Sequence, residues 1–180
     1  MSTRARRKPP QLIVRRLRGS ATSGLLEFGP YVMRCALGRG GIRANKREGD
    51  GATPRTAMRL VEAYYNPSRG RRPITALPVR AIQALDGWCD EPNDRNYNRR
   101  VRHPYPMSAE RLWREDQLYD LLVVLDYNIA PRKRGAGSAI FMHVARDGCR
   151  PTEGCIALSI DDLRRILRAV GRQTRVVTSA

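Results

Sequence analysis

The chain has 180 residues, of which 41% are hydrophobic and 28% charged, and this composition is typical of a globular domain rather than a disordered segment. Its formal net charge of +17 favours an anionic partner such as nucleic acid, a membrane surface or an acidic polymer. No aromatic-rich RNA-binding motif or recognition helix accompanies this charge, so nucleic acid is not the expected partner. No apolar run approaches the roughly 20 residues of a membrane-spanning helix, and four cysteines do not make a disulfide scaffold in a chain this long.

Residues 1–10 are expected to form a basic disordered arm ahead of one domain at 11–180. The segment "QLIVRRL" that follows predicts a strand, because Leu12 and Val14 alternate with more polar neighbours. "LLEFGPYVMRCALGRGGI" predicts one or two further strands around a Gly-Pro turn, as in a hairpin. A polar loop then leads into an alternating apolar stretch near Met58, which predicts another strand.

The region 66–107 is dense in Pro, Gly, Asp and Asn and predicts a long irregular insertion, a kind of segment that is usually functional or mobile. "SAERLWRED" at 108–116 predicts a short helix, and "LYDLLVVLDYN" a buried strand. "RKRGAGSAIFMHVAR" is a basic, glycine-containing loop that leads into another strand. "SIDDLRRILRAVG" predicts a helix capped by Ser159, and "TRVVTS" a closing strand. The expected fold is mainly β, with minor α+β character and one packed C-terminal helix.

The stretch "HVARDGCRPTEGCIALS" contains His143, Cys149 and Cys155, and it permits several interpretations. These three residues have the ligand types of a catalytic zinc site, although zinc ligands are commonly closer together in sequence. Cys149 and Cys155 could also form a disulfide, or both could be buried small residues. Cys35 and Cys89 are expected to be buried and to have no chemical role.

Cys155 has the surroundings expected of a nucleophile. Gly154 before it lets a substrate carbonyl approach the backbone, where N–H groups can stabilise an oxyanion. His143 ends an apolar run, "SAIFMH", from which an imidazole can reach a neighbouring strand. An adjacent histidine can accept the thiol proton and lower the thiol pKa.

Thr152, Glu153, Gly154 and Cys155 match the [S/T]-x-G-C block of the L,D-transpeptidases with a YkuD-type domain, and His143 matches their upstream histidine. The whole stretch therefore resembles the catalytic signature of that family. "IRANKREGDGATPRTAMRL" resembles the family's T-P-x-G-x-F strand and its approach, and "GSAIFMH" resembles the strand that carries the histidine.

The resemblance covers about residues 31–176. The blocks "CALGRGGI", "KREGDGATP", "LYDL" and "PTEGC" are similar to a short, single-domain proteobacterial branch of the family. The resemblance implies a YkuD-like β-sandwich or barrel with the C-terminal helix packed on it.

The activity implied by the resemblance is cross-linking of peptidoglycan stem peptides without a metal or cofactor. Cys155 would attack an L residue joined to a D residue, and a diaminopimelate amine of a second stem would resolve the thioester. His143 would act as base and acid, and backbone N–H groups of Cys155 and its neighbours would hold the oxyanion. Thr152 would orient His143 or close the site from the side, and Gly154 belongs to the same block.

The chain departs from the family pattern in ways that bear on substrate binding. Glu153 stands where a histidine or similar residue is usual, Ala157 stands where many members have arginine, and His143 precedes Cys155 by only 12 residues. The substrate must therefore be held by other side chains. The candidates are Arg43, Lys46, Arg134 in the "RKRG" loop, and Trp88, Tyr97 and Trp113. The short branch is associated with an L-alanine donor, which is the preferred expectation here.

Location and outcome of the reaction leave alternatives open. The basic N-terminal stretch lacks the apolar core of a signal peptide, yet the implied substrate lies in the periplasm, so the periplasm or cell envelope is the expected location. Hydrolysis of the thioester would make the same site an L,D-carboxypeptidase or endopeptidase. A third alternative is a basic module that binds nucleic acid or the envelope and whose cysteine is structural.

Overall fold

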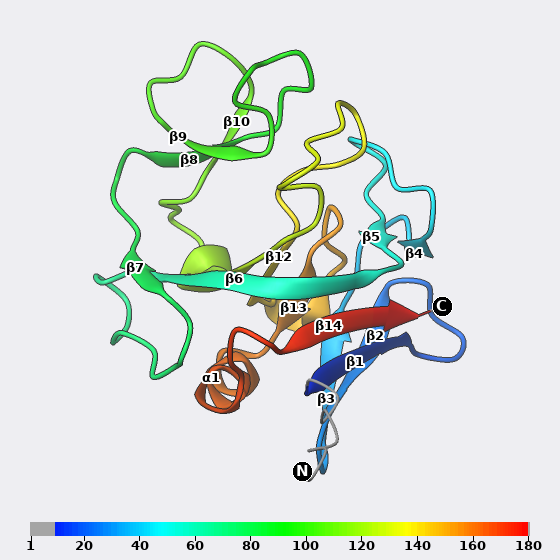
Figure 1. Cartoon of the computed structure of the whole chain (residues 1–180). Coiled ribbons are helices and arrows are strands. Elements are labelled where there is room, and N and C mark those ends of the chain that lie inside the picture. The colour runs from blue at the N-terminus through cyan, green and yellow to red at the C-terminus, as the bar shows by residue number, and fades with distance from the viewer. Residues whose placement is uncertain (1–9, 180) are drawn as a thin grey trace, which may run out of the picture.

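The computed structural model describes residues 10–179, so the predicted basic arm lies outside the described residues except for Pro10. One sheet of nine strands dominates, in the order β11-β12-β13-β3-β2-β1-β14-β6-β7. An additional pairing of β11 with β6 closes all of its strands but β7 into a barrel-like ring (Figure 1). Its strands are β1 (Gln11–Arg16), β2 (Ser23–Phe28), β3 (Tyr31–Ala36), β6 (Ala57–Tyr65), β7 (Val79–Ala81), β11 (Leu121–Leu125), β12 (Phe141–Val144), β13 (Ile156–Leu158) and β14 (Arg175–Ser179).

The N-terminal half confirms the strands predicted from alternation. Leu12 and Val14 of β1 are fully buried, and β2 and β3 form the expected antiparallel hairpin around the Gly29–Pro30 turn. β1 also pairs in parallel with β14, the predicted closing strand, so both ends of the described chain lie in neighbouring strands (Figure 1). Short strands β4 (Ile42–Arg43) and β5 (Thr53–Pro54) pair with each other beside the barrel.

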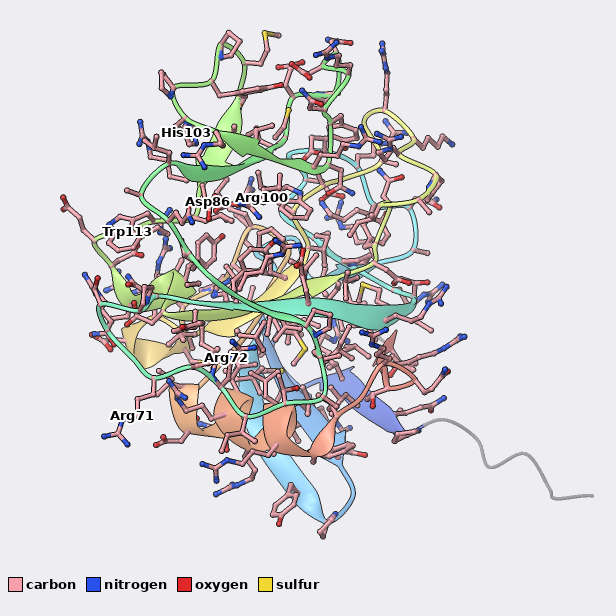
Figure 2. The ribbon with its side chains drawn as sticks, turned by 60° about the vertical axis from the view of Figure 1, so that its left-hand side comes forward. Arg71, Arg72, Asp86, Arg100, His103 and Trp113 are labelled. Carbon is pink, nitrogen blue, oxygen red and sulfur yellow. The ribbon has the colours of Figure 1, made fainter. Side chains whose placement is uncertain are left out.

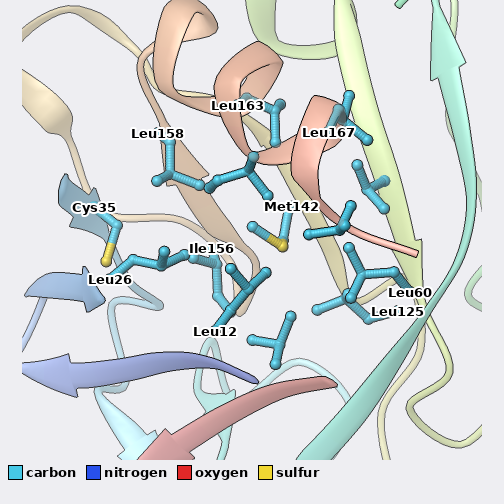
Figure 3. Packing of buried hydrophobic residues seen from close by; sticks show 14 of the residues in the cluster. Leu12, Leu26, Cys35, Leu60, Leu125, Met142, Ile156, Leu158, Leu163 and Leu167 are labelled. Atoms are coloured by element: carbon cyan, nitrogen blue, oxygen red, sulfur yellow. The ribbon is translucent and has the colours of Figure 1, made fainter. Parts of the chain in front are cut away.

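The predicted C-terminal helix is α1 (Ile160–Ala169), which packs against the barrel. The Ser159 side chain accepts a hydrogen bond from the Asp162 backbone N–H at 3.1 Å, and this contact fixes the start of the helix. Leu163, Ile166 and Leu167 are fully buried in one large cluster with side chains of the barrel strands (Figure 3). The mainly β fold with one packed C-terminal helix is thereby confirmed.

Side-chain alternation along β12 divides the interior into two clusters. Met142 and Val144 belong to the large cluster under α1, whereas Phe141 belongs to a second cluster on the opposite face. His143 is buried and follows the same alternation as Phe141. This second face is where the insertion packs.

The insertion at 66–107 is more ordered than predicted. It contains β7, β8 (Asp86–Cys89) and β9 (Arg99–Arg102), and with β10 (Ala109–Arg111) the last two form a small sheet in the order β10-β8-β9. Figures 1 and 2 show this sheet above the barrel, and Figure 2 shows its Asp86 and Arg100 between the two layers. Asp86 is buried, and the Arg100 guanidinium lies 3.1 Å from its carboxylate.

The short helix predicted at 108–116 is wrong, because residues 109–111 form β10. Glu110 pairs there with Trp88 of β8. The nearest helical segment is a single 3-10 turn, η1 (Gln117–Tyr119), which follows the predicted helix. The open edge of β8 offers backbone hydrogen bonds that a half-capped helix of this length lacks. Elsewhere, a second 3-10 turn, η2 (Asp147–Cys149), joins β12 to β13. No helix in the described part of the chain is long and apolar enough to span a membrane.

Candidate active site

Strand register brings the histidine and one cysteine of the quoted stretch together. β12 and β13 pair in parallel with His143 opposite Ala157. Cys155 lies two residues before Ala157 and therefore projects from the same face. His143 and Cys155 both line a cavity of about 170 Å³ beneath the insertion.

The turn that presents Cys155 is held by glycine and threonine. Gly154 has φ +134°, and a Cβ atom there would lie 2.8 Å from the backbone oxygen of Ala52. The Thr152 hydroxyl accepts a hydrogen bond from the Gly154 N–H at 3.2 Å and donates one to the Cys155 carbonyl at 2.6 Å. Thr152 therefore fixes the turn that carries the cysteine, and its hydroxyl is not bonded to His143.

The Cys155 thiol is protonated and buried. Its Sγ donates to the Ala139 carbonyl at 3.2 Å and accepts from the Phe141 N–H at 3.3 Å. Burial, and secondly the nearby charge of Glu110, raise the thiol pKa to about 12. The expectation that histidine lowers this pKa is not met, because the buried imidazole is itself uncharged.

The imidazole of His143 is neutral. Burial lowers its pKa to about 4, so the imidazole is unprotonated at neutral pH. Its Nδ1 lies 2.8 Å from the Val144 carbonyl oxygen, and this contact assigns the proton to Nδ1 and leaves a lone pair on Nε2. The Tyr119 ring meets the imidazole edge-on, with ring centroids 5.4 Å apart and an angle of 81°.

The cavity is lined by charges of both signs, in contrast to the basic composition of the chain. The cationic side chains are Arg114, Arg146 and Arg150, and the acidic ones are Glu48, Asp90, Glu110 and Glu153. Several are fixed in place by neighbours. Arg39 binds both oxygens of Glu153 at 3.0 and 2.8 Å, and Tyr97 and Ser138 donate to one oxygen of Glu48 at 2.5 and 2.8 Å.

A second, more open depression of about 400 Å³ continues from the cavity. The two share Leu118, Arg146 and Arg150, and the second extends to Arg69. No ion pair within the described residues engages Arg146 or Arg150. Two guanidinium groups are therefore available at the junction to bind carboxylates.

The basic side chains predicted to bind substrate are not among the residues that line the cavity. Lys46 is buried and donates to Asp50 at 2.5 Å, and it lines a separate depression together with Arg134. Arg43 donates to the Gly40 carbonyl at 3.0 Å. None of the three lines the cavity that holds Cys155.

The predicted aromatic side chains have packing contacts. Trp88 donates to Asn98 at 2.9 Å and meets Phe141 edge-on, with ring centroids 5.3 Å apart. Trp113 packs at the border of the same cluster, and Figure 2 shows it at the side of the insertion. Tyr97 is buried, and its contact with the site runs through the hydrogen bond to Glu48.

All four cysteines are free thiols, and Cys35 and Cys89 are buried as expected. Within residues 10–179, no cluster of His, Cys, Asp and Glu has an arrangement that could bind a metal ion.

Several residues of the cavity were not predicted from the sequence, and four of them bear on its chemistry: Arg146, Arg150, Glu110 and Tyr119. Arg146 and Arg150 flank η2 within the quoted stretch, and their position close to Cys155 in the sequence was an available signal. Glu110 and Tyr119 had no such signal, because they reach the site only through the pairing of β10 with β8 and the packing of η1 against β12.

Comparison with known proteins agrees with this geometry. Residues 27–178 match the family model described as YkuD, the L,D-transpeptidase catalytic domain. No curated protein and no solved structure gives a significant match. The match covers α1, the insertion, His143, Cys155 and most of the barrel, with β1 and the start of β2 lying before it, and the chain belongs to the YkuD family of L,D-transpeptidase catalytic domains.

Proposed function

We propose that the protein cross-links peptidoglycan stem peptides as an L,D-transpeptidase, with Cys155 as nucleophile and His143 as general base and acid. The observation that carries the proposal is the placement of this thiol and this neutral imidazole in one cavity of a YkuD domain. Peptidoglycan stems carry free carboxylates, and the net charge of +17 would attract such a polymer.

In the first half-reaction, Nε2 of His143 removes the Cys155 proton as the sulfur attacks the carbonyl of an L residue. A thiol with a pKa of about 12 does not ionise before substrate binds, so proton transfer accompanies the attack. The imidazolium then protonates the amine of the departing D residue, and the acyl group remains on Cys155 as a thioester. The Cys155 N–H is the proposed oxyanion donor, since the Gly154 N–H is already bonded to Thr152.

In the second half-reaction, an amine of another stem attacks the thioester. The new amide forms, the C–S bond breaks, and His143 passes the proton from the amine nitrogen to the departing sulfur. Arg146 and Arg150 would bind stem carboxylates at the mouth of the cavity, in place of the arginine that other members carry after the cysteine. L-alanine is the proposed donor residue and diaminopimelate the acceptor, and the cell envelope the proposed location.

The test is mass spectrometry of purified muropeptide monomers incubated with the protein or with Cys155→Ala. Cross-linked dimers that are missing with the variant are the expected result, and fragmentation of the dimers identifies the donor residue. Shortened monomers without dimers would instead establish a hydrolase with the same nucleophile. Unchanged muropeptides in both samples would contradict an enzymatic role and favour an envelope-binding module.

A further inference from the structure

Glu110 is an acidic side chain in the catalytic cavity that the reaction described above does not use. It lies on β10, just after the insertion, and lines the same cavity as Cys155 and His143. Its place there depends on the pairing of β10 with β8, in which Glu110 lies opposite Trp88 of the second cluster. The small sheet therefore delivers a carboxylate to a site built on the barrel.

Tyr119 connects this carboxylate to the catalytic base. The Tyr119 hydroxyl donates to Oε1 of Glu110 at 2.5 Å, while its ring packs edge-on against His143. Burial raises the pKa of Tyr119 well above its ordinary value, so the hydroxyl keeps its proton and donates. Among the described residues, none donates a hydrogen bond to Oε2 of Glu110, which leaves that oxygen available to a ligand in the cavity.

The charge of Glu110 opposes the first half-reaction. A carboxylate near the Cys155 thiol disfavours the thiolate, and the raised pKa of Cys155 reflects this in addition to burial. For the first half-reaction alone, the Cys155 thiol would react faster if the Glu110 carboxylate were absent. The second half-reaction has the opposite need, because an aliphatic amine is an ammonium ion at neutral pH and cannot attack until it loses a proton.

We propose that Glu110 binds the ammonium group of the acceptor and removes one proton from it, which makes the amine nucleophilic. The inference rests on the proposed function. The ammonium gives a proton to the Glu110 carboxylate, and the free amine attacks the thioester carbon. The second amine proton passes through His143 to the departing sulfur of Cys155. The products are the amide, the thiol and a protonated Glu110, which returns its proton to solvent.

Desolvation suits Glu110 to this task. Burial raises its carboxyl pKa above the ordinary value, and the hydrogen bond from Tyr119 and the nearby Arg114 limit that rise by stabilising the charged form. A carboxylate with a raised pKa is a stronger base toward ammonium than one in water.

The test separates the two half-reactions in Glu110→Gln. Donor muropeptides with acetylated amines form the thioester but bring no acceptor amine of their own, and intact-protein mass spectrometry follows that adduct. The adduct is then mixed with either diaminopimelate-containing monomers, whose amine is protonated, or hydroxylamine, which is unprotonated at neutral pH. Gln keeps an oxygen that accepts the Tyr119 hydrogen bond, so the fold is retained, and Glu27→Gln on β2 matches the change of charge away from the site.

The expected result is that Glu110→Gln forms the adduct and reacts with hydroxylamine at the wild-type rate, but reacts with the monomers about 100-fold more slowly. The inference would be overturned if Glu110→Gln reacted with each acceptor at the wild-type rate. It would also be overturned if the variant were slowed equally with both acceptors, since that result indicates a positioning role alone. Absence of the adduct in the wild type would overturn the proposed function, and this inference with it.

Discussion

Gly154 is the position at which a single methyl group tests the geometry of the site. In Gly154→Ala the new Cβ would lie 2.8 Å from the backbone oxygen of Ala52, which has no side-chain freedom to retreat, and φ of +134° is strained for any L residue. Strain of this kind costs about 1–3 kcal/mol before the contact is counted. We therefore expect a loss of about 3 kcal/mol in the free energy of unfolding, which lowers Tm by about 6–12 °C in a chain of this size.

Gly148 provides the matched control, because it also has a positive φ, +71°, but a Cβ there would meet nothing within 4 Å. Gly148→Ala carries the left-handed penalty of about 1–2 kcal/mol, partly offset by about 0.4–1 kcal/mol from a less flexible unfolded chain. Unfolding in denaturant, followed by tryptophan fluorescence, compares the two. If the two variants lose the same free energy of unfolding to within about 0.5 kcal/mol, an error typical of such comparisons, the contact with Ala52 is refuted.

Three further predictions concern the hydroxyl, the imidazole and the thiol. Thr152→Val leaves two buried backbone groups unpaired and should lose about 1–3 kcal/mol in denaturant unfolding, whereas Thr152→Ser keeps both bonds; equal stability of the two variants would contradict this role. Because the His143 pKa falls from 6.5 to about 4 on folding, the unfolded chain binds more protons between these values. The free energy of unfolding should drop by up to about 3 kcal/mol as pH falls through that range. If His143→Gln shows the same drop, the titration of other groups causes it. Burial raises the Cys155 pKa to about 12, and Cys149 is more exposed. Iodoacetamide at pH 7.5 should therefore modify Cys149 first, as measured by peptide mass spectrometry. Earlier labelling of Cys155 would refute a protonated, buried thiol.

Elements whose stability is local could be predicted from the sequence. The alternation of Leu12 and Val14 and the apolar stripe that follows the Ser159 cap each identify a buried face without reference to the rest of the chain. Cys155 and His143 were predicted as a pair from their block, although only the β12–β13 register explains why they share a cavity. Residues 109–111 form a strand because β8 offers an edge, which no local pattern reveals.

The substrate-binding candidates illustrate a different limit. Lys46 and Arg43 carry the charge that binds anions, yet their side chains are hydrogen-bonded to Asp50 and to the Gly40 carbonyl. Charge shows that a residue attracts anions, but partners decide whether it is available, and those partners are set by the fold. Arg146 and Arg150, which have no ion-pair partner among the described residues, lie instead on either side of η2.

The contrast between the whole chain and its cavity has a physical consequence. A net charge of +17 acts on a polyanion from a distance, but salt limits that attraction to about one Debye length, roughly 8–10 Å, from the surface. Inside the cavity, recognition depends on the nearest groups, and there Glu48, Asp90 and Glu110 lie with the arginines around one thiol. A purely basic cavity would hold stem carboxylates and repel the ammonium that must resolve the thioester. On the proposed mechanism, the basic surface therefore brings the polymer to the enzyme, and the carboxylates of the cavity admit the amine.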